Sequence, residues 1–436
     1  MLRPPTVRRV FVVSVCVFGL MYAVLPTEVF YVYTEPTEQE HAYKLKKNVS
    51  DINPDTSVQP RVDVNSNIHK ETPEGVELKY ILRWNKRIPP LHVMDEGQTA
   101  FYRHDCEYKN CFITHNRTFL GDITKFDAIE FNVKECPELT ASDLPKRRLE
   151  TQKYIFGAAE SAQNYPICDP VYDDFFNWTW TYRLNSDILW RYITIYDLEG
   201  HIVGPKPDMK WPELAPVSDE FKKQLESKYK VVAWFVSHCR TMSKREKVVA
   251  TLSREAKLKY SWDVDVYGGC GILKCPRERR LECFDIIRRD YYFYLSFENS
   301  FGQDYVTEKL LNALNNDAVP IVFGSADYSR FLPPGSYLDA REIGPIKLAE
   351  SIDAIYKNKT RYYDFFRWKN HFRYIYQDDV CNLCAAMNDK EAVRLRTVYK
   401  NFRRWWNEEP CIDCGFESRS IPVYVFLVQY FLSKII

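Results

Sequence analysis

The stretch YYFYLSFENSFGQDYVTEK, from Tyr291 to Lys309, is the most informative part of this chain. Its aromatic beginning, Tyr291 to Phe297, predicts a buried strand, because aromatic and β-branched residues favour strands. Asp304 is a candidate N-cap. Apolar residues follow it at helical spacing, at Val306, Leu310, Ala313 and Leu314. The stretch thus predicts a strand, a polar turn and a helix that carries Glu308 and Lys309 in its second turn.

A strand that leads into a helix directs the free N–H groups and the positive dipole end of that helix toward the strand's carboxyl end. Open α/β sheets bind nucleotides at this edge. Strands predicted at 231–236, 264–267 and 319–323, with a helix predicted at 244–260, surround the stretch. Strands that alternate with helices indicate a parallel sheet, so we expect this half to be an α/β domain.

The preceding half also consists of short apolar runs separated by turn signals. Its strand candidates are KYILRW at 79–84, FDAIEFNV at 126–133 and YIFGAAES at 154–161. The proline-containing run GPKPDMKWPELAP at 204–216 interrupts regular structure and predicts the connection between the halves. A length of 436 residues fits two domains of roughly 150 residues each plus extensions.

Several runs of sequence resemble one family. FYLSFENS, DYVTEK, AVPIVFG and the run FFNWTWTYRLNSDI at 175–188 are similar to the α1,3-fucosyltransferases of glycosyltransferase family 10. The runs AWFVSHC and YGGCG look closer to its invertebrate and plant members. The resemblance spans about Leu78 to Cys384. It implies a GT-B-like fold, in which two Rossmann-like domains face a cleft. It also implies inverting transfer of L-fucose from GDP-β-L-fucose to a GlcNAc hydroxyl of a glycan in α1,3 linkage.

Transfer of a sugar from a nucleotide requires positive charge near the departing diphosphate, supplied by a metal or by fixed cations. Arg245 and Lys309 are the candidate cations, since a guanidinium binds phosphate oxygens bidentately and an ammonium supplies a point charge. The alternative is that both are solvated helix residues. From the sequence alone this alternative is favoured for Arg245, and for Lys309 it is as well supported as phosphate binding. The resemblance assigns both side chains to the phosphates.

The resemblance also implies contacts with the donor for a further set of residues: Ser237, Tyr294, Asn299, Tyr305 and Glu308. Glu308 would bind hydroxyls of the donor sugar, and its alternative is a carboxylate on a helix surface. His238 departs from the family, because many relatives have Asn after the Ser. It can still donate a hydrogen bond, but a change in its charge near pH 6.5 would make donor binding sensitive to pH.

Attack by an acceptor hydroxyl needs a general base on the opposite face of the donor sugar. Glu160 follows the YIFGAA run, and the resemblance assigns it this role. A lone glutamate after a strand is otherwise usually a solvated side chain. The family has Glu-Ser-Pro here, whereas this chain has Glu160, Ser161 and Ala162. One base without a covalent nucleophile implies inversion at the anomeric carbon.

Asp263 and Asp265 have the D-x-D spacing of metal-dependent glycosyltransferases. In WDVDVYG, however, both alternate with apolar residues as in a strand. Metal binding there remains the alternative to fixed cations. We expect no required cofactor beyond the donor substrate GDP-fucose, and at most stimulation by a divalent cation.

An apolar, uncharged run near the N-terminus predicts a membrane anchor. Val10 to Leu25 is long enough to span a bilayer, at the short end of what is needed. Arginines precede it and glutamates follow it, so the positive-inside rule leaves the N-terminus cytosolic. A cleaved signal peptide is the alternative. N-glycosylation sequons at Asn48, Asn116, Asn177 and Asn358 agree with a single-pass type II Golgi membrane protein whose catalytic domain is lumenal.

The chain has 13 cysteines, and twelve remain when Cys16 in the apolar run is set aside. An even number in an oxidising compartment predicts disulfides. The two C-x-x-C pairs, Cys381 with Cys384 and Cys411 with Cys414, leave a zinc ribbon as the alternative. The resemblance pairs a late C-x-x-C with Cys106 and Cys111, and it leaves a second local set: Cys239, Cys270, Cys275 and Cys283.

A net charge of +1 and the lack of any recognition motif argue against nucleic acid as a partner. The expected partners are GDP-fucose, a glycan on a glycoprotein or glycolipid, and the Golgi membrane. The core GlcNAc of N-glycans is slightly favoured over an antennal acceptor. The competing function is a catalytically silent glycan-binding protein on the same fold. A silent protein would be free to lose the set that this chain retains: Glu160, Arg245, Glu308 and Lys309.

The predicted organisation follows from these runs. It consists of a cytosolic tail at 1–9, an anchor at 10–27, a stem at 28–77, an N-terminal acceptor-side domain at 78–215, a GDP-fucose-binding domain at 216–375, and a cysteine-rich segment with an apolar tail at 376–436.

Overall fold

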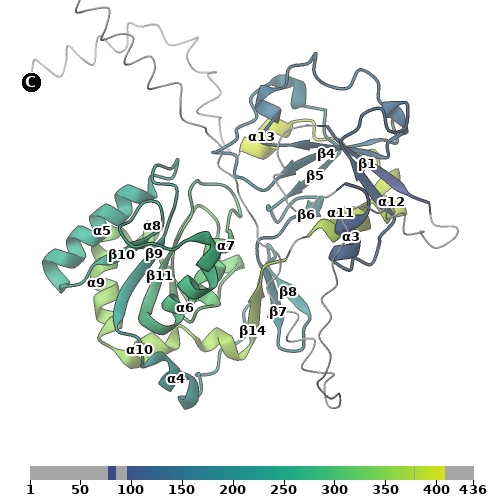
Figure 1. Ribbon diagram of the computed structural model, residues 1–436. Coiled ribbons are helices and arrows are strands. Elements are labelled where there is room, and N and C mark those ends of the chain that lie inside the picture. The colour runs from purple at the N-terminus through teal and green to yellow at the C-terminus, as the bar shows by residue number, and fades with distance from the viewer. Residues whose placement is uncertain (1–76, 85–95, 378, 408–436) are drawn as a thin grey trace, which may run out of the picture. The chain divides into compact units, whose positions relative to one another are not determined.

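The computed structural model describes residues 77–84, 96–377 and 379–407 (Figure 1). The predicted cytosolic tail, the anchor, nearly all of the stem and the apolar C-terminal tail lie outside these residues. No helix within the described part is both long enough and apolar enough to cross a membrane.

The first sheet is parallel throughout and contains six strands in the order β2-β1-β3-β4-β5-β6. The strands are β1 (Lys79–Arg83), β2 (Cys111–Thr114), β3 (Ala128–Asn132), β4 (Lys153–Ala158), β5 (Trp178–Thr181) and β6 (Ile188–Leu189). The three strands predicted in this half are confirmed as β1, β3 and β4.

Helices from distant parts of the chain cover this sheet. Alternate residues of a strand point to opposite faces, and Ile81 and Leu82 accordingly belong to different apolar clusters. Ile81 packs in a cluster with α3 (Thr99–Arg103) and α11 (Val380–Asn388). Leu82 belongs to a cluster that includes α13 (Phe402–Asn407). A short helix, α12 (Lys390–Arg394), links α11 to the approach to α13.

The second sheet is also parallel, with five strands in the order β10-β9-β11-β12-β13. Its strands are β9 (Lys230–Phe235), β10 (Val264–Tyr267), β11 (Tyr291–Phe297), β12 (Val319–Phe323) and β13 (Leu338–Asp339). The strands predicted at 231–236, 264–267, 291–297 and 319–323 are confirmed, and so is the predicted parallel arrangement.

Helices lie on both faces of the second sheet (Figure 1). On one face α5 (Arg245–Tyr260) and α9 (Pro345–Tyr356) pack against β9, β11 and β12. On the other face α6 (Arg280–Asp290) and α7 (Glu308–Leu314) contribute Ile287 and Ala313 to a cluster around Tyr291. Shorter helices complete this half: α4 (Asp219–Leu225), α8 (Ala340–Ile343) and α10 (Lys359–Asp364).

A small antiparallel sheet joins segments of the two halves. Its strands are β7 (Thr194–Asp197), β8 (Ile202–Gly204) and β14 (Phe372–Ile375), in the order β14-β7-β8. The predicted connection at 204–216 contains no helix or strand after Gly204 and leads to α4.

The start of α7 differs from the sequence prediction. The N-cap is Thr307 and the helix begins at Glu308, so Glu308 and Lys309 lie in the first turn and not in the second. Asp304 has a left-handed backbone, with φ at 59°. Its carboxylate pairs with Arg330 at 3.0 Å and accepts the Leu184 N–H at 3.1 Å. Asp304 therefore does not cap α7, whose N-cap is Thr307.

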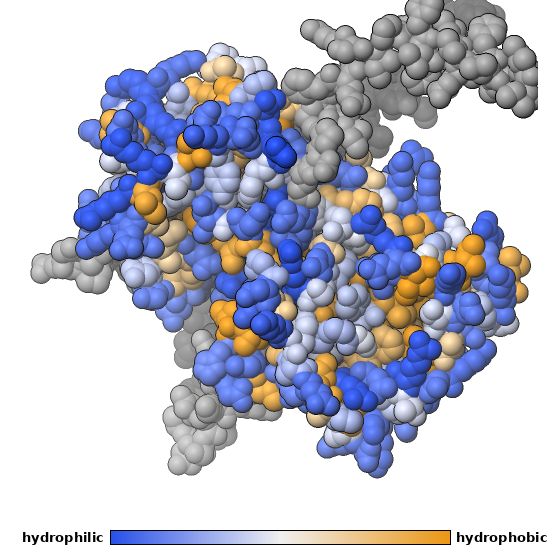
Figure 2. All heavy atoms as spheres, turned by 180° about the vertical axis from the view of Figure 1, so that it is seen from behind, coloured by the Kyte–Doolittle hydropathy of each residue, from blue (hydrophilic) through white to orange (hydrophobic). Residues whose placement is uncertain are grey.

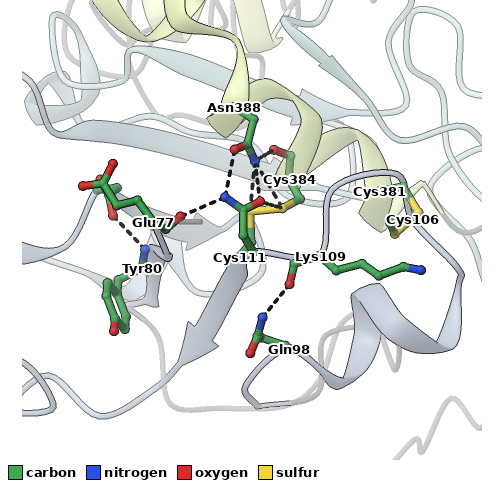
Figure 3. The surroundings of a disulfide bond; sticks show 11 residues. Glu77, Tyr80, Gln98, Cys106, Lys109, Cys111, Cys381, Cys384 and Asn388 are labelled. Carbon is green, nitrogen blue, oxygen red and sulfur yellow. Dashed lines mark hydrogen bonds between the residues drawn. A yellow bond between two sulfur atoms is a disulfide. The ribbon is translucent and has the colours of Figure 1, made fainter. Parts of the chain in front are cut away.

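Disulfides tie α11 to the beginning of the first sheet (Figure 3). Cys106 pairs with Cys381, and Cys111 pairs with Cys384, as the resemblance implied. The zinc alternative is therefore wrong for Cys381 and Cys384, and the other C-x-x-C pair lies outside the described residues. The local set forms two further disulfides, Cys239 with Cys270 and Cys275 with Cys283.

One cysteine departs from the expected complete pairing. Cys136 is buried and carries a free thiol, and burial raises its pKa well above the ordinary value. Cys168 is disulfide-bonded. The prediction of disulfides holds for the other described cysteines, and a small apolar side chain such as Cys136 can remain reduced in the interior.

Figure 2 shows hydrophilic residues over much of one face, with hydrophobic residues scattered between them.

In the part of the chain described here, no group of three or more histidine, cysteine or acidic side chains is arranged to hold a metal ion.

Candidate functional site

Three loops carry most of the predicted site residues, and each follows the carboxyl end of a parallel strand. Glu160 follows β4 of the first sheet, Ser237 and His238 follow β9, and Asn299 follows β11. Carboxyl ends of parallel strands are where α/β sheets place ligand-binding loops.

Glu160 meets the second half of the chain through a hydrogen bond. Its Oε2 accepts the Tyr305 hydroxyl at 3.0 Å and the Asn164 amide at 3.3 Å. Tyr305 is buried, and its hydroxyl also lies 3.3 Å from Asn299 Oδ1. Burial and the nearby Glu160 carboxylate raise the pKa of Tyr305, so it stays a neutral donor. The structure thus brings Glu160, Asn299 and Tyr305 together.

The loop around these residues is held by the first half at two more points. The Ser161 hydroxyl donates to Ser300 Oγ at 2.6 Å, and both side chains are buried. Gln163 Oε1 accepts the Phe301 N–H at 2.7 Å. These bonds lie just after Glu160 in the chain, so they hold its segment against the loop that follows β11.

Lys309 lies among carboxylates. Its Nζ is 3.0 Å from Glu298 Oε2, 3.3 Å from Glu308 Oε1 and 2.6 Å from Thr307 Oγ1. Burial disfavours the charged ammonium, but the two carboxylates outweigh this and the pKa of Lys309 is raised. Burial likewise acts against the charged form of Glu308, yet Lys309 lowers the pKa of that carboxyl. Lys309 is therefore a charged cation at neutral pH.

Arg245 begins α5 and is buried, with 4% of its surface exposed. One Nη donates to the Phe297 carbonyl, the other lies 3.5 Å from the His238 carbonyl, and Nε has no hydrogen-bond partner among the described residues. Burial lowers the pKa of Arg245 from its usual value. A buried guanidinium with unused hydrogen-bonding capacity at the end of β11 could bind an anion.

Ser237 and His238 are exposed on the loop after β9. The turn after β10 packs against this loop so closely that a Cβ on Gly268, whose φ is +97°, would lie 2.6 Å from the Val236 carbonyl oxygen. The Cys239–Cys270 disulfide joins the same two loops. The backbone of the Ser237 loop is therefore held by a covalent bond as well as by packing.

Tyr294 is the predicted site residue that lies deepest. Its ring is buried in the cluster between β11 and α7, and its hydroxyl accepts a bond from the Asn312 amide at 3.4 Å. Burial raises its pKa to about 12. The structure thus places Tyr294 inside the domain, behind the loops that carry the other candidates.

The D-x-D pair does not converge on a common point. Asp263 pairs with Lys257 at 2.7 Å, and Asp265 pairs with Lys230 at 3.2 Å. Asp265 also accepts the Tyr291 hydroxyl. Each carboxylate thus has its own cation on a different element, which is the arrangement of two separate ion pairs.

Glu298 and Thr307 belong to the Lys309 cluster but were missed in the sequence. Glu298 is 1% exposed and follows directly after the last residue of β11. The available signal was a carboxylate next to an otherwise apolar strand, because buried charges are rare unless they are paired.

Comparison with known proteins gives matches over both halves. The family description "Fucosyltransferase, N-terminal" matches residues 77–193, and "Glycosyltransferase family 10 (fucosyltransferase) C-term" matches residues 225–405. "Alpha-(1,3)-fucosyltransferase C" of Drosophila melanogaster is 37% identical over 346 residues, which cover 78% of this chain and 76% of that protein. "Glycoprotein 3-alpha-L-fucosyltransferase A" of the same species is 30% identical over 343 residues, covering 78% of this chain and 62% of that protein.

A crystal structure of an "alpha1,3-Fucosyltransferase with GDP" aligns with a TM-score of 0.44 and 14% identity, over 77% of this chain and 96% of that one. The sequence matches are the decisive ones, since they extend through both parallel sheets and their loops. The chain belongs to glycosyltransferase family 10, the fucosyltransferases.

Proposed function

We propose that this protein transfers L-fucose from GDP-β-L-fucose to a GlcNAc hydroxyl of a glycan in α1,3 linkage, with inversion at the anomeric carbon. The observation that carries the proposal is the hydrogen bond from Tyr305 to Glu160. It joins the candidate base after β4 to the loop that carries candidate donor contacts after β11. A base and a donor site must lie this close for a direct displacement.

In this mechanism Glu160 removes the proton of the acceptor hydroxyl while that oxygen attacks the anomeric carbon of fucose. The bond from this carbon to the diphosphate breaks on the opposite side, which inverts the centre. Negative charge grows on the departing GDP, and Arg245 and Lys309 stabilise it. Glu308, which is partly exposed beside Lys309, binds hydroxyls of the fucose, and Ser237, His238 and Asn299 contact the remainder of the donor.

The acceptor is proposed to be an N-glycan, with the core GlcNAc slightly favoured over an antennal one. The runs AWFVSHC and YGGCG support this choice, because they look closer to the invertebrate and plant enzymes that modify the core GlcNAc of N-glycans. So does the similarity to a relative whose name describes fucosyl transfer to glycoproteins. We also propose that the protein is a single-pass type II Golgi membrane protein, because of the uncharged run at 10–25 and the arginines that precede it.

The test is to incubate the purified full-length protein with GDP-fucose and a panel of N-glycans that differ in whether the core or the antennal GlcNAc is available. Mass spectrometry and linkage analysis of the products should show one added fucose, α1,3-linked to the core GlcNAc. Antennal fucose alone would contradict the acceptor. Glycan binding without any transfer, by a protein that binds GDP, would favour the silent glycan-binding alternative.

A further inference from the structure

A buried carboxylate lies behind the predicted phosphate-binding lysine. Glu298 is 1% exposed, and it is the first residue after β11. Its Oε1 accepts the Thr307 N–H at 2.9 Å, and both of its carboxylate oxygens lie 3.0 Å from Thr307 Oγ1. Its Oε2 lies 3.0 Å from Lys309 Nζ. The Thr307 N–H, the Thr307 hydroxyl and the Lys309 ammonium are all hydrogen-bond donors, and an ionised carboxylate can only accept.

These contacts link the strand end to both the start of α7 and the ammonium group. Thr307 is the N-cap of α7, and Glu298 accepts its N–H from a different element. Lys309 lies in the first turn of α7, and its ammonium contacts the carboxylate of Glu298, which is fixed at the end of β11. The Ser296 hydroxyl also donates to the Lys309 carbonyl at 2.9 Å, which ties the same turn to β11.

We infer that Glu298 is a positioning residue for the donor site, which fixes the Lys309 ammonium where the diphosphate binds. The inference rests on the proposed function, because it requires Lys309 to contact the donor. Without the carboxylate, Thr307 and Glu308 would be the only described residues that hold the flexible four-carbon side chain of Lys309. Glu308 is 35% exposed and is itself assigned to the sugar, so it cannot replace the buried anchor.

Glu298 also matters because of the second cation nearby. Arg245 is buried at the end of the same strand, through its bond to the Phe297 carbonyl. Burial and the charge of Arg245 act to lower the pKa of Lys309, whereas Glu298 acts to raise it, so the carboxylate offsets the repulsion between the two cations before the donor arrives.

The test is a double-mutant cycle on GDP affinity, measured by calorimetry on the full-length protein. Glu298→Gln keeps the shape but removes the charge, and we expect GDP affinity to fall roughly tenfold. Lys309→Gln should weaken GDP binding as well. In the Lys309→Gln background, Glu298→Gln should cause no further loss, because the group that Glu298 positions is gone.

A matched control comes from the first sheet. Glu130 is also a 1% exposed glutamate, paired with Arg83 at 3.3 Å. Glu130→Gln should lower the melting temperature but leave GDP affinity unchanged, which separates a general effect of burying an amide from an effect on the donor site. If Glu298→Gln does not fold, Thr307→Val removes the hydroxyl shared by Glu298 and Lys309. It should lower GDP affinity several-fold, and only when Lys309 is present.

Two results would overturn the inference alone: wild-type GDP affinity in Glu298→Gln beside a weakened Lys309→Gln, or an equal loss in both backgrounds. The second of these would mean that Glu298 only supports the fold. If Lys309→Gln bound GDP like the wild type, the role of Lys309 in the proposed function would itself fail. The cycle thus distinguishes failure of the inference from failure of the function beneath it.

Discussion

At the scale of single residues, Glu160 shows how much depends on contacts that are distant in sequence. Locally it is a glutamate after a strand, and such residues are usually solvated. Its carboxylate instead accepts the hydroxyl of Tyr305, which lies 145 positions later. The local sequence does not predict that contact, and only the family resemblance indicated Glu160 as the general base.

Glu160→Gln retains the size and the hydrogen-bonding shape of the side chain but cannot accept a proton. We expect fucose transfer to fall by roughly 10²–10⁴-fold, the usual contribution of a general base. GDP affinity should hardly change, because the bond to Tyr305 can still form. Turnover and GDP affinity should be measured on the same preparation. Near wild-type transfer would remove Glu160 from the mechanism, and a parallel loss of GDP binding would make it a structural residue.

Asn177 shows the opposite case, a motif that the fold uses for another purpose. It stands in a glycosylation sequon, but it is buried, and its side chain accepts the Tyr154 N–H at 2.8 Å and donates to the Thr397 carbonyl at 2.7 Å. Asn116 and Asn358 are exposed. Peptide mapping of protein secreted by a eukaryotic host should find glycans at the exposed sites and none at Asn177.

The same contacts predict an effect on stability. Asn177→Ala leaves the buried Tyr154 N–H without a partner, which should lower the free energy of unfolding by about 1–3 kcal/mol. Asn116→Ala is the control. Among the described residues its side chain bonds only to Thr118 in the same exposed turn, so we expect a change within about 0.5 kcal/mol. Equal effects in denaturant titrations would contradict this account.

At the scale of elements, close packing between neighbouring strands decides where a glycine is required. A Cβ on Gly157 of β4 would lie 2.3 Å from Glu130 Oε1 on β3, and Glu130 is paired with Arg83 on β1. Gly157→Ala should therefore displace a buried ion pair. We expect a loss of about 3 kcal/mol or more in the free energy of unfolding. An unchanged denaturation midpoint would show that the pair can move aside.

The D-x-D pair before and within β10 leads to a prediction about metals. Since Asp263 and Asp265 each have a lysine partner, and charge on the leaving group is assigned to side chains, we expect fucosyl transfer to continue in excess EDTA. Added Mn²⁺ or Mg²⁺ should at most stimulate it. Complete loss in EDTA, reversed only by a divalent ion, would mean that a metal supplies the charge.

Most strands of the second sheet could be predicted, because they are buried on both faces and read as continuous apolar runs. β10, β11 and β12 have the predicted bounds. The predicted start of α7 was wrong. Aspartate is a suitable N-cap residue, but the carboxylate of Asp304 pairs with Arg330 instead. Partners of this kind are distant in sequence. Glu298 was missed for another reason, because its partners Thr307 and Lys309 are close in sequence but reach it only through the way the turn between β11 and α7 folds.

At the scale of the whole molecule, two disulfides close nearly the same large loop. Cys106 and Cys381 are 275 residues apart, and Cys111 and Cys384 are 273 apart. Once either bond has formed, the other closes only a small ring between the neighbouring cysteines. Replacing one pair with serines should therefore cost roughly 2–3 kcal/mol of stability, and replacing both pairs should cost at least twice that.

Thermal unfolding of the three serine variants would check this prediction. If the two single-pair variants each lost as much as the variant without either pair, the bonds would be needed jointly for the fold and loop closure would not explain their effect. The Cys275–Cys283 pair, which closes a short loop in the other half, provides the control.

The packing of α11 and α13 on the first sheet has a consequence for biosynthesis. Proteins made on ribosomes usually complete their N-terminal domain first, but here the apolar faces of β1 and β3 wait for residues 380–406. At about 5–20 residues per second, the thiol of Cys106 waits on the order of tens of seconds for Cys381 to be translated. The second sheet, whose strands and main helices lie between residues 230 and 356, has all its parts earlier. The half that is synthesised first is thus completed last, and until residues 380–406 are made its apolar faces lack the helices that cover them.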